Sequence, residues 1–98
     1  MSSESIFQSR LIDRIKTELP GSIILKNDPL NFNGIPDLTI FFGNRYALLE
    51  CKRDAKAHRQ PNQTYFVNKF NEMSFSAFIC PENESDILES MYTYLKGG

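Results

Sequence analysis

The sequence predicts an α/β (α+β) fold with four strands and three helices. Two segments, residues 3–19 and 84–95, repeat apolar residues every three or four positions, a period typical of amphipathic helices. Between them lie short runs rich in β-branched and aromatic residues, bounded by Gly, Asn and Pro, which indicate strands. Gly43 and Asn44 separate two of these runs and predict a two-residue hairpin turn. We therefore expect the order α-β-β-β-α-β-α in a single domain spanning residues 1–98.

The first helix is expected over residues 3–19, because a serine can cap its start and a Pro-Gly pair stops it. Its apolar stripe, which should face the core, consists of Phe7, Leu11, Ile15 and Leu19. Glu4 lies in the first turn, close to this stripe. A short apolar strand at 22–25 follows, and an irregular loop rich in Asn, Pro and Gly continues to Pro36.

The hairpin is expected to join strands at about 37–42 and 45–52. Because side chains alternate between the two faces of a strand, one face of this hairpin is wholly apolar. It carries Leu38, Ile40, Phe42, Ala47, Leu49 and Cys51, and it should meet the helices. The opposite face is apolar near the turn and charged at the open end, where Asp37, Glu50 and Lys52 lie.

A polar loop at 53–60 leads to a helix from Pro61 to about Met73, since proline suits the first helical position. The expected buried stripe of this helix is Phe66, Phe70 and Met73. Tyr65, Phe66 and Phe70 are interpreted as core residues rather than as a platform on which nucleic-acid bases stack.

The chain is expected to end with a strand at 75–80 and a helix that opens at Asn83 or Glu84. The buried residues of that helix should be Ile87, Leu88, Met91 and Leu95. An acidic run at 82–89 precedes and overlaps it, and is interpreted as a solvated helix face.

Charge is unevenly distributed, although the net charge of −1 gives no general attraction to nucleic acid. A basic run directly follows the charged end of the hairpin, where phosphates of a bound strand would pass. Its residues, which we expect to contact phosphate, are Lys52, Arg53, Lys56, Arg59 and the only histidine, His58. The alternative interpretation is an ordinary solvated loop.

Cys51 and Cys80 both lie in apolar runs and predict small buried side chains in a reducing, cytoplasmic compartment rather than a disulfide framework. No Cys/His cluster has the spacing of a zinc site. No run is apolar and long enough to span a membrane, so we expect no membrane partner. We also expect no small-molecule cofactor.

The hairpin turn makes the spacing of three charged residues meaningful. In a two-residue turn at Gly43-Asn44, Phe42 pairs with Arg45, so the numbers of two paired residues always add up to 87. Asp37 therefore lies opposite Glu50. Like charges directly opposed on a sheet are destabilising, and a divalent cation between them removes that penalty. Lys52, two residues beyond Glu50, points to the same face. This pattern predicts a metal-assisted phosphodiester site, with a cross-strand salt-bridge cluster as the alternative.

The opening helix, the meander with Pro-Asp and Glu-x-Lys on its second and third strands, and the helix–strand ending resemble the PD-(D/E)XK nuclease superfamily. Within it, the chain resembles the small stand-alone VRR-NUC-type nucleases of phages and prophages. The resemblance covers nearly the whole chain and rests on residues 25–29, 34–38, 49–52, 60–63, 73–75 and 81–84. It implies a restriction-endonuclease-like core with a mixed four-stranded sheet flanked by helices.

The resemblance implies that Asp37 and Glu50 hold Mg²⁺ or Mn²⁺ together with the backbone carbonyl of Cys51, where such proteins more often have Val. Lys52 would be the catalytic lysine. The family's glutamate on the first helix falls on Glu4, which could serve a second metal or simply be a favourable charge at a helix start. The family's glutamine falls on Gln63, and this match implies a role near the site, with a hydrogen bond to Lys52, water or phosphate. The alternative is a first-turn polar residue of no consequence.

The implied reaction is hydrolysis of DNA by a homodimer, and a two-fold pair of sites favours branched DNA such as a four-way junction. Lys26 and Asn27, within the resembling run, are expected to border the site and contact DNA. Three alternatives stay open: a nicking or end-processing nuclease on linear or single-stranded DNA, an inactive DNA-binding module of the same fold, and an interaction protein with an incidental salt-bridge cluster.

Overall fold

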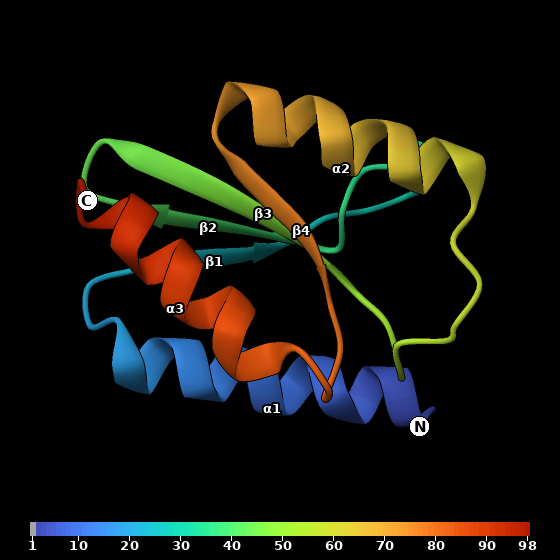
Figure 1. Ribbon diagram of the computed structural model, residues 1–98, viewed down its shortest axis with the longest axis horizontal. Coiled ribbons are helices and arrows are strands. Elements are labelled where there is room, and N and C mark those ends of the chain that lie inside the picture. Colours follow the sequence, from blue (N-terminus) through green and yellow to red (C-terminus); the bar gives the residue numbers. More distant parts are fainter. Residues whose placement is uncertain (1) are drawn as a thin grey trace.

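The computed structural model describes residues 2–98 and arranges three helices around one four-stranded sheet (Figure 1). The elements are α1 (Ser3–Glu18), β1 (Ile23–Lys26), β2 (Leu38–Phe42), β3 (Arg45–Cys51), α2 (Pro61–Met73), β4 (Phe75–Ile79) and α3 (Glu84–Leu95). The predicted order α-β-β-β-α-β-α is confirmed. Boundaries differ from the sequence-based ones by only one or two residues. Ser2 caps α1, since its hydroxyl oxygen accepts the Ser5 N–H at 3.1 Å.

The sheet is mixed, with spatial order β1-β2-β3-β4. The first two pairings are antiparallel, whereas β3 and β4 run parallel and are joined through α2. The hairpin register confirms the turn prediction, because Phe42 pairs with Arg45 and Leu38 pairs with Leu49. Gly43 adopts φ of +61°, a value that favours glycine at this turn.

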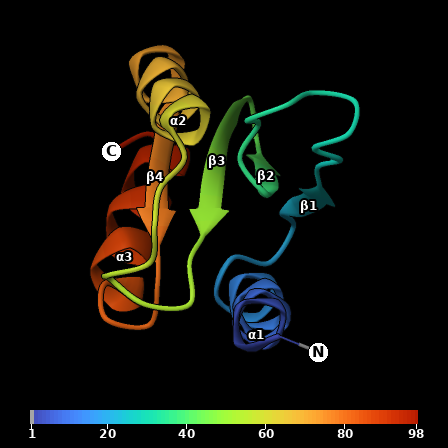
Figure 2. The same cartoon turned by 90° about the vertical axis from the view of Figure 1, so that its right-hand side faces the viewer.

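The main core lies between one face of the sheet and the helices α1 and α3, which share that face while α2 covers the other (Figure 2). The sheet contributes Leu38, Ile40, Ala47, Leu49, Cys51 and Ile79, and the helices contribute Phe7, Leu11, Ile15, Leu88, Met91 and Leu95. The wholly apolar hairpin face therefore meets helices, as its alternation predicts.

Replacing Leu11 with alanine should lower the free energy of unfolding by about 2–5 kcal/mol, because Leu11 is fully buried in this core. Ile6→Ala on the same helix is the matched control, since the Ile6 side chain is 48% exposed. Urea denaturation followed by circular dichroism measures both. Equal losses in the two variants would contradict the assignment of the α1 face that packs on the sheet.

The expected buried stripe of α2 is wrong in part. Val67 is the buried residue of this helix, Phe66 and Phe70 are half-buried, and Met73 is 59% exposed. Tyr65, expected in the core, is 60% exposed. The physical reason is that α2 packs on β3 and β4 rather than across the whole sheet, so only a narrow side of the helix is covered.

Both cysteines, Cys51 and Cys80, are buried and unpaired, as their apolar surroundings predict. Burial raises the pKa of the Cys51 thiol, which keeps it a neutral core side chain. No helix within residues 2–98 is long and apolar enough to cross a membrane.

Candidate active site

The end of the loop that precedes β2 is fixed by Asn27. Its backbone N–H donates to the Asp37 carbonyl at 2.8 Å, and its side-chain amide donates to the Pro36 carbonyl at 2.9 Å and the Thr39 hydroxyl at 2.8 Å. These three bonds tie the end of β1 to the start of β2. Asn27 thus holds the backbone of Asp37 in place, and its contact with DNA stays a prediction.

Asp37 and Glu50 meet at the open end of the hairpin. An Asp37 carboxylate oxygen, Oδ2, accepts the backbone N–H of Cys51 at 2.8 Å, which draws the carboxylate across to β3. The register that pairs Leu38 with Leu49 continues in the direction of Asp37 and Glu50. Glu50 is only 4% exposed, so one of the two opposed carboxyl groups is almost removed from water.

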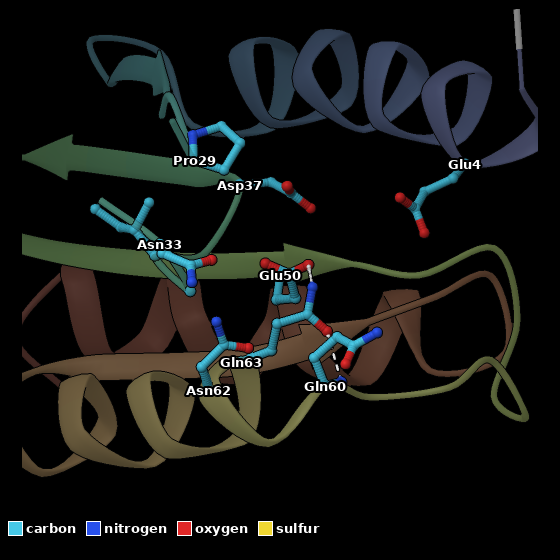
Figure 3. Close-up of a pocket in the computed structure, with 10 residues that line it drawn as sticks. Glu4, Pro29, Asn33, Asp37, Glu50, Gln60, Asn62 and Gln63 are labelled. Atoms are coloured by element: carbon cyan, nitrogen blue, oxygen red, sulfur yellow. Dashed lines mark hydrogen bonds between the residues drawn. The ribbon is translucent and has the colours of Figure 1, made fainter. Parts of the chain in front are cut away.

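Gln63 links Glu50 to Lys52 from the first turn of α2. Its amide nitrogen donates to Glu50 Oε2 at 3.1 Å (Figure 3). Its amide oxygen accepts from Lys52 Nζ at 2.8 Å. Lys52 Nζ also donates to the His58 carbonyl at 3.0 Å. The same Gln63 oxygen accepts the Gln60 N–H at 3.0 Å as part of the helix cap. The contact between Gln63 and Lys52 matches the sequence-based expectation for Gln63.

Burial dominates the electrostatics of the acidic pair. It raises the pKa of Glu50 to about 8, with the Asp37 charge adding to the effect and the Lys52 charge opposing it. Burial also raises the pKa of Asp37, although the hydrogen bond from Cys51 counters it. Without a cation the pair therefore holds a proton near neutral pH, as two carboxyl groups sharing one buried site do.

A polar cavity of about 430 Å³ opens over these groups (Figure 3). Four segments line it: α1, the loop before β2, the hairpin end and the start of α2. The lining side chains include Glu4, Pro29, Asn33, Asp37, Glu50, Gln60, Asn62 and Gln63. Glu4 projects from α1 toward the carboxylates in Figure 3, and its charge raises the pKa of Glu50.

The donor set suits a hard divalent cation. Asp37 and Glu50 each use one carboxylate oxygen in the bonds above, and the Cys51 thiol lies in the core, so the available donors are oxygens. Within residues 2–98, no three His, Cys, Asp or Glu side chains converge on one point, so Glu4 does not complete a three-ligand cluster. Two carboxylates with water completing the shell is an arrangement that Mg²⁺ adopts in proteins.

Most of the side chains predicted to contact DNA lie on the loop after β3, and one lies at the end of β1. Arg53, Lys56, His58 and Arg59 are exposed on the loop after β3. The Arg59 guanidinium stacks 4.0 Å from the centre of the Phe78 ring, which holds it against β4. Lys26 is exposed at the end of β1, and its charge lowers the pKa of Asp37.

The arrangement of these elements matches a known structure. No protein-family model and no curated protein matches the sequence. A solved structure described as "VRR_NUC domain" superposes with a TM-score of 0.72, covering 91% of this chain and 97% of that one at 20% identity. The chain therefore has the same fold as that VRR_NUC domain structure. The predicted mixed-sheet fold class is thereby confirmed.

Two residues that line this cavity carry no local sequence signal. Asn33 and Asn62 face the same cavity from segments about thirty positions apart. Gly34 brings them together, because it has φ of +93° and an added Cβ would lie 3.0 Å from the Phe66 ring and 3.1 Å from Asn62 Cβ. The Gly34 backbone therefore packs tightly on α2, a contact that residue spacing alone does not reveal.

Replacing Gln63 with alanine should weaken Mn²⁺ binding at the acidic pair about 10- to 100-fold, since outer partners of metal ligands have effects of this size. The variant releases both Lys52 Nζ and Glu50 Oε2 from their shared amide. Calorimetric titration with Mn²⁺ measures the effect. Gln60→Ala, which shares the helix cap but not the Lys52 bond, is the control for cap loss. Equal affinities in Gln63→Ala and wild type would contradict a positioning role.

Proposed function

We propose that this protein is a metal-dependent DNA endonuclease, a deoxyribonuclease that hydrolyses phosphodiester bonds. The observation that carries the proposal is the opposed carboxyl groups of half-buried Asp37 and buried Glu50, with Glu50 linked to Lys52 through Gln63. The VRR-NUC-type fold of the chain supports it, because the solved structure it resembles is named for a nuclease domain.

Each side chain has a role that its position supports. Asp37 and Glu50, with the Cys51 carbonyl, would hold Mg²⁺ or Mn²⁺. A bound cation supplies charge neutralisation at the phosphate and lowers the pKa of an attacking water. Lys52 Nζ, held by Gln63 Oε1 at 2.8 Å, would orient that water and stabilise the charge that builds on the phosphate oxygens. Glu4, which faces the carboxylates across the cavity, would help to bind a second cation.

The proposed substrate is branched DNA, with the four-way junction first. One domain of 98 residues offers little surface to grip a duplex, so we propose a homodimer whose two-fold axis presents two sites to two strands. The basic residues exposed on the loop after β3 support the proposal that this side of the protein contacts DNA phosphates. The two unpaired buried cysteines support a reducing, cytoplasmic setting.

The test is cleavage of labelled four-way junction, flap, linear duplex and single-stranded DNA with Mg²⁺, Mn²⁺ or EDTA. We expect metal-dependent cutting, fastest on the junction, that Lys52→Ala lacks. Fastest cutting of linear or single-stranded DNA would favour the nicking or end-processing alternative. An absence of cutting, with equal DNA binding by both proteins, would identify a binding module.

A protein with an incidental salt-bridge cluster would bind no cation at this site. Its melting temperature would not change when Mn²⁺ is added. The proposed nuclease should melt at a higher temperature with Mn²⁺, because ligand that binds only the folded state stabilises it. That shift should vanish in Asp37→Ala.

A further inference from the structure

A cluster of exposed apolar side chains lies beside the polar cavity. Leu30 and Phe32 on the loop before β2 are 93% and 41% exposed, and Tyr65 on α2 is 60% exposed. The half-buried ring of Phe66 joins two of them, with ring centres 4.9 Å from Phe32 and 4.9 Å from Tyr65, both edge to face. We name Leu30, Phe32 and Tyr65, with Phe66 behind them, the apolar ledge. Single exposed apolar residues need no explanation, whereas exposed apolar side chains gathered beside a cavity are a feature of binding sites.

The ledge is held in a defined shape. The Asp28 carboxylate accepts the Leu30 N–H at 2.9 Å, and the Ile35 N–H donates to the Phe32 carbonyl at 3.2 Å. The close packing of Gly34 on Phe66 fastens this loop to α2. Side chains presented by such a braced loop lose little conformational entropy when a ligand binds.

The ledge is continuous with the cavity. Pro29 and Asn33, which are sequence neighbours of Leu30 and Phe32, line the cavity that holds Asp37 and Glu50 (Figure 3). Asn62, three residues before Tyr65, lines it from α2. A strand whose phosphate lies at the carboxylates would therefore extend past polar amides and then reach apolar and aromatic side chains.

We propose that the apolar ledge packs against an unpaired base next to the phosphodiester in the cavity. The preferred substrate would then be DNA with unpaired nucleotides at the cleavage point, such as an open junction or a gap. The inference rests on the proposed nuclease function and specifies its substrate class. Aromatic side chains stack on any base, whereas a base inside a duplex is already stacked on its neighbours.

A second copy of the chain is a less suitable occupant. A stable protein interface buries on the order of 800 Å² on each partner, around twenty or more residues, and the ledge presents three exposed side chains. The asparagines at its edge add hydrogen-bonding groups suited to the polar edges of bases.

The test is binding of two fluorescent DNAs, a single strand and a fully paired duplex, measured by anisotropy in EDTA at low salt. Tyr65→Ala should weaken single-strand binding about tenfold, the loss expected for one stacked base, and change duplex binding less than twofold. Tyr65→Phe, which keeps the ring, should bind as wild type does. Leu30→Ser should show the same selectivity for the single strand.

Equal single-strand affinity of wild type, Tyr65→Ala and Leu30→Ser would overturn the inference. So would a drop in molecular mass of Tyr65→Ala on size-exclusion chromatography with light scattering, since the ledge would then be a protein interface. The anisotropy measurement does not depend on DNA cleavage. If the variants lose single-strand binding selectively but the wild type cuts no DNA, base binding by the ledge is supported and the nuclease function is rejected. Failure of one proposal is therefore distinguishable from failure of the other.

Discussion

Asp37→Asn should abolish both cation binding and DNA cleavage. The amide keeps the size of the carboxylate and an oxygen able to accept the Cys51 N–H now bonded at 2.8 Å, so the hairpin end should stay folded. It loses the negative charge that a divalent cation requires. We expect the rate with Mn²⁺ to fall by more than the roughly 10- to 100-fold caused by losing an outer partner of a metal site.

Calorimetric titration with Mn²⁺ and a cleavage time course measure the two losses. Asp28→Asn is the matched control, because Asp28 lies on the same loop, is exposed, and uses its carboxylate to accept the Leu30 N–H. It should bind Mn²⁺ and cut DNA as wild type does. Normal cutting by Asp37→Asn would remove Asp37 from the metal site.

The cation-free protein should lose stability as the pH rises from about 5 to 8. In the unfolded chain Glu50 releases its proton near its ordinary pKa of 4.5, whereas in the folded state it keeps the proton up to about pH 8. Between these values the folded state binds more protons, so the free energy of unfolding falls with increasing pH. The loss should be on the order of 2–4 kcal/mol, given about 1.4 kcal/mol for each pKa unit and some relaxation of the site.

Glu50→Gln removes the titrating group and imitates its protonated form. Denaturation in EDTA at pH 5, 6, 7 and 8 should show a flatter pH dependence for this variant than for wild type. Saturating Mg²⁺ should restore stability at pH 8 to wild type only, because the variant lacks the charged ligand. Parallel pH profiles of wild type and variant in EDTA would refute a raised pKa of Glu50.

The hairpin end was predictable from sequence because two local rules act together there. A Gly-Asn turn of two residues sets the register, and the alternation of side chains sets the face. From these, the position of Asp37 opposite Glu50 follows by counting along the strands, and the observed pairing of Leu38 with Leu49 agrees. The open end of the hairpin thus follows from local rules alone, without any tertiary contact.

The environment of α2 was not predictable in the same way. Its helical period marks Phe66, Phe70 and Met73 as one side, but the period does not say how wide a surface the sheet offers. The helix covers only β3 and β4, and the loop before β2 packs on Phe66 from the side. Tyr65 and Met73 therefore stay exposed.

The roles of individual polar residues show the same limit. Gln63 was placed near the site by its match to the family pattern, and its 2.8 Å contact with Lys52 is present. The contact of Asn27 with DNA stays a prediction, and the bonds of its amide to Pro36 and Thr39 carried no sequence signal. Residue type and spacing suggest which groups lie near a site, whereas the available partners decide how each group is used.

Anomalous diffraction at the manganese edge, from crystals grown with Mn²⁺, would locate the cation in this protein. We expect one strong peak between the carboxylates of Asp37 and Glu50, within bonding distance of the Cys51 carbonyl oxygen. A peak elsewhere, or no peak at a Mn²⁺ concentration that supports DNA cleavage, would contradict the assignment of these residues as the metal site.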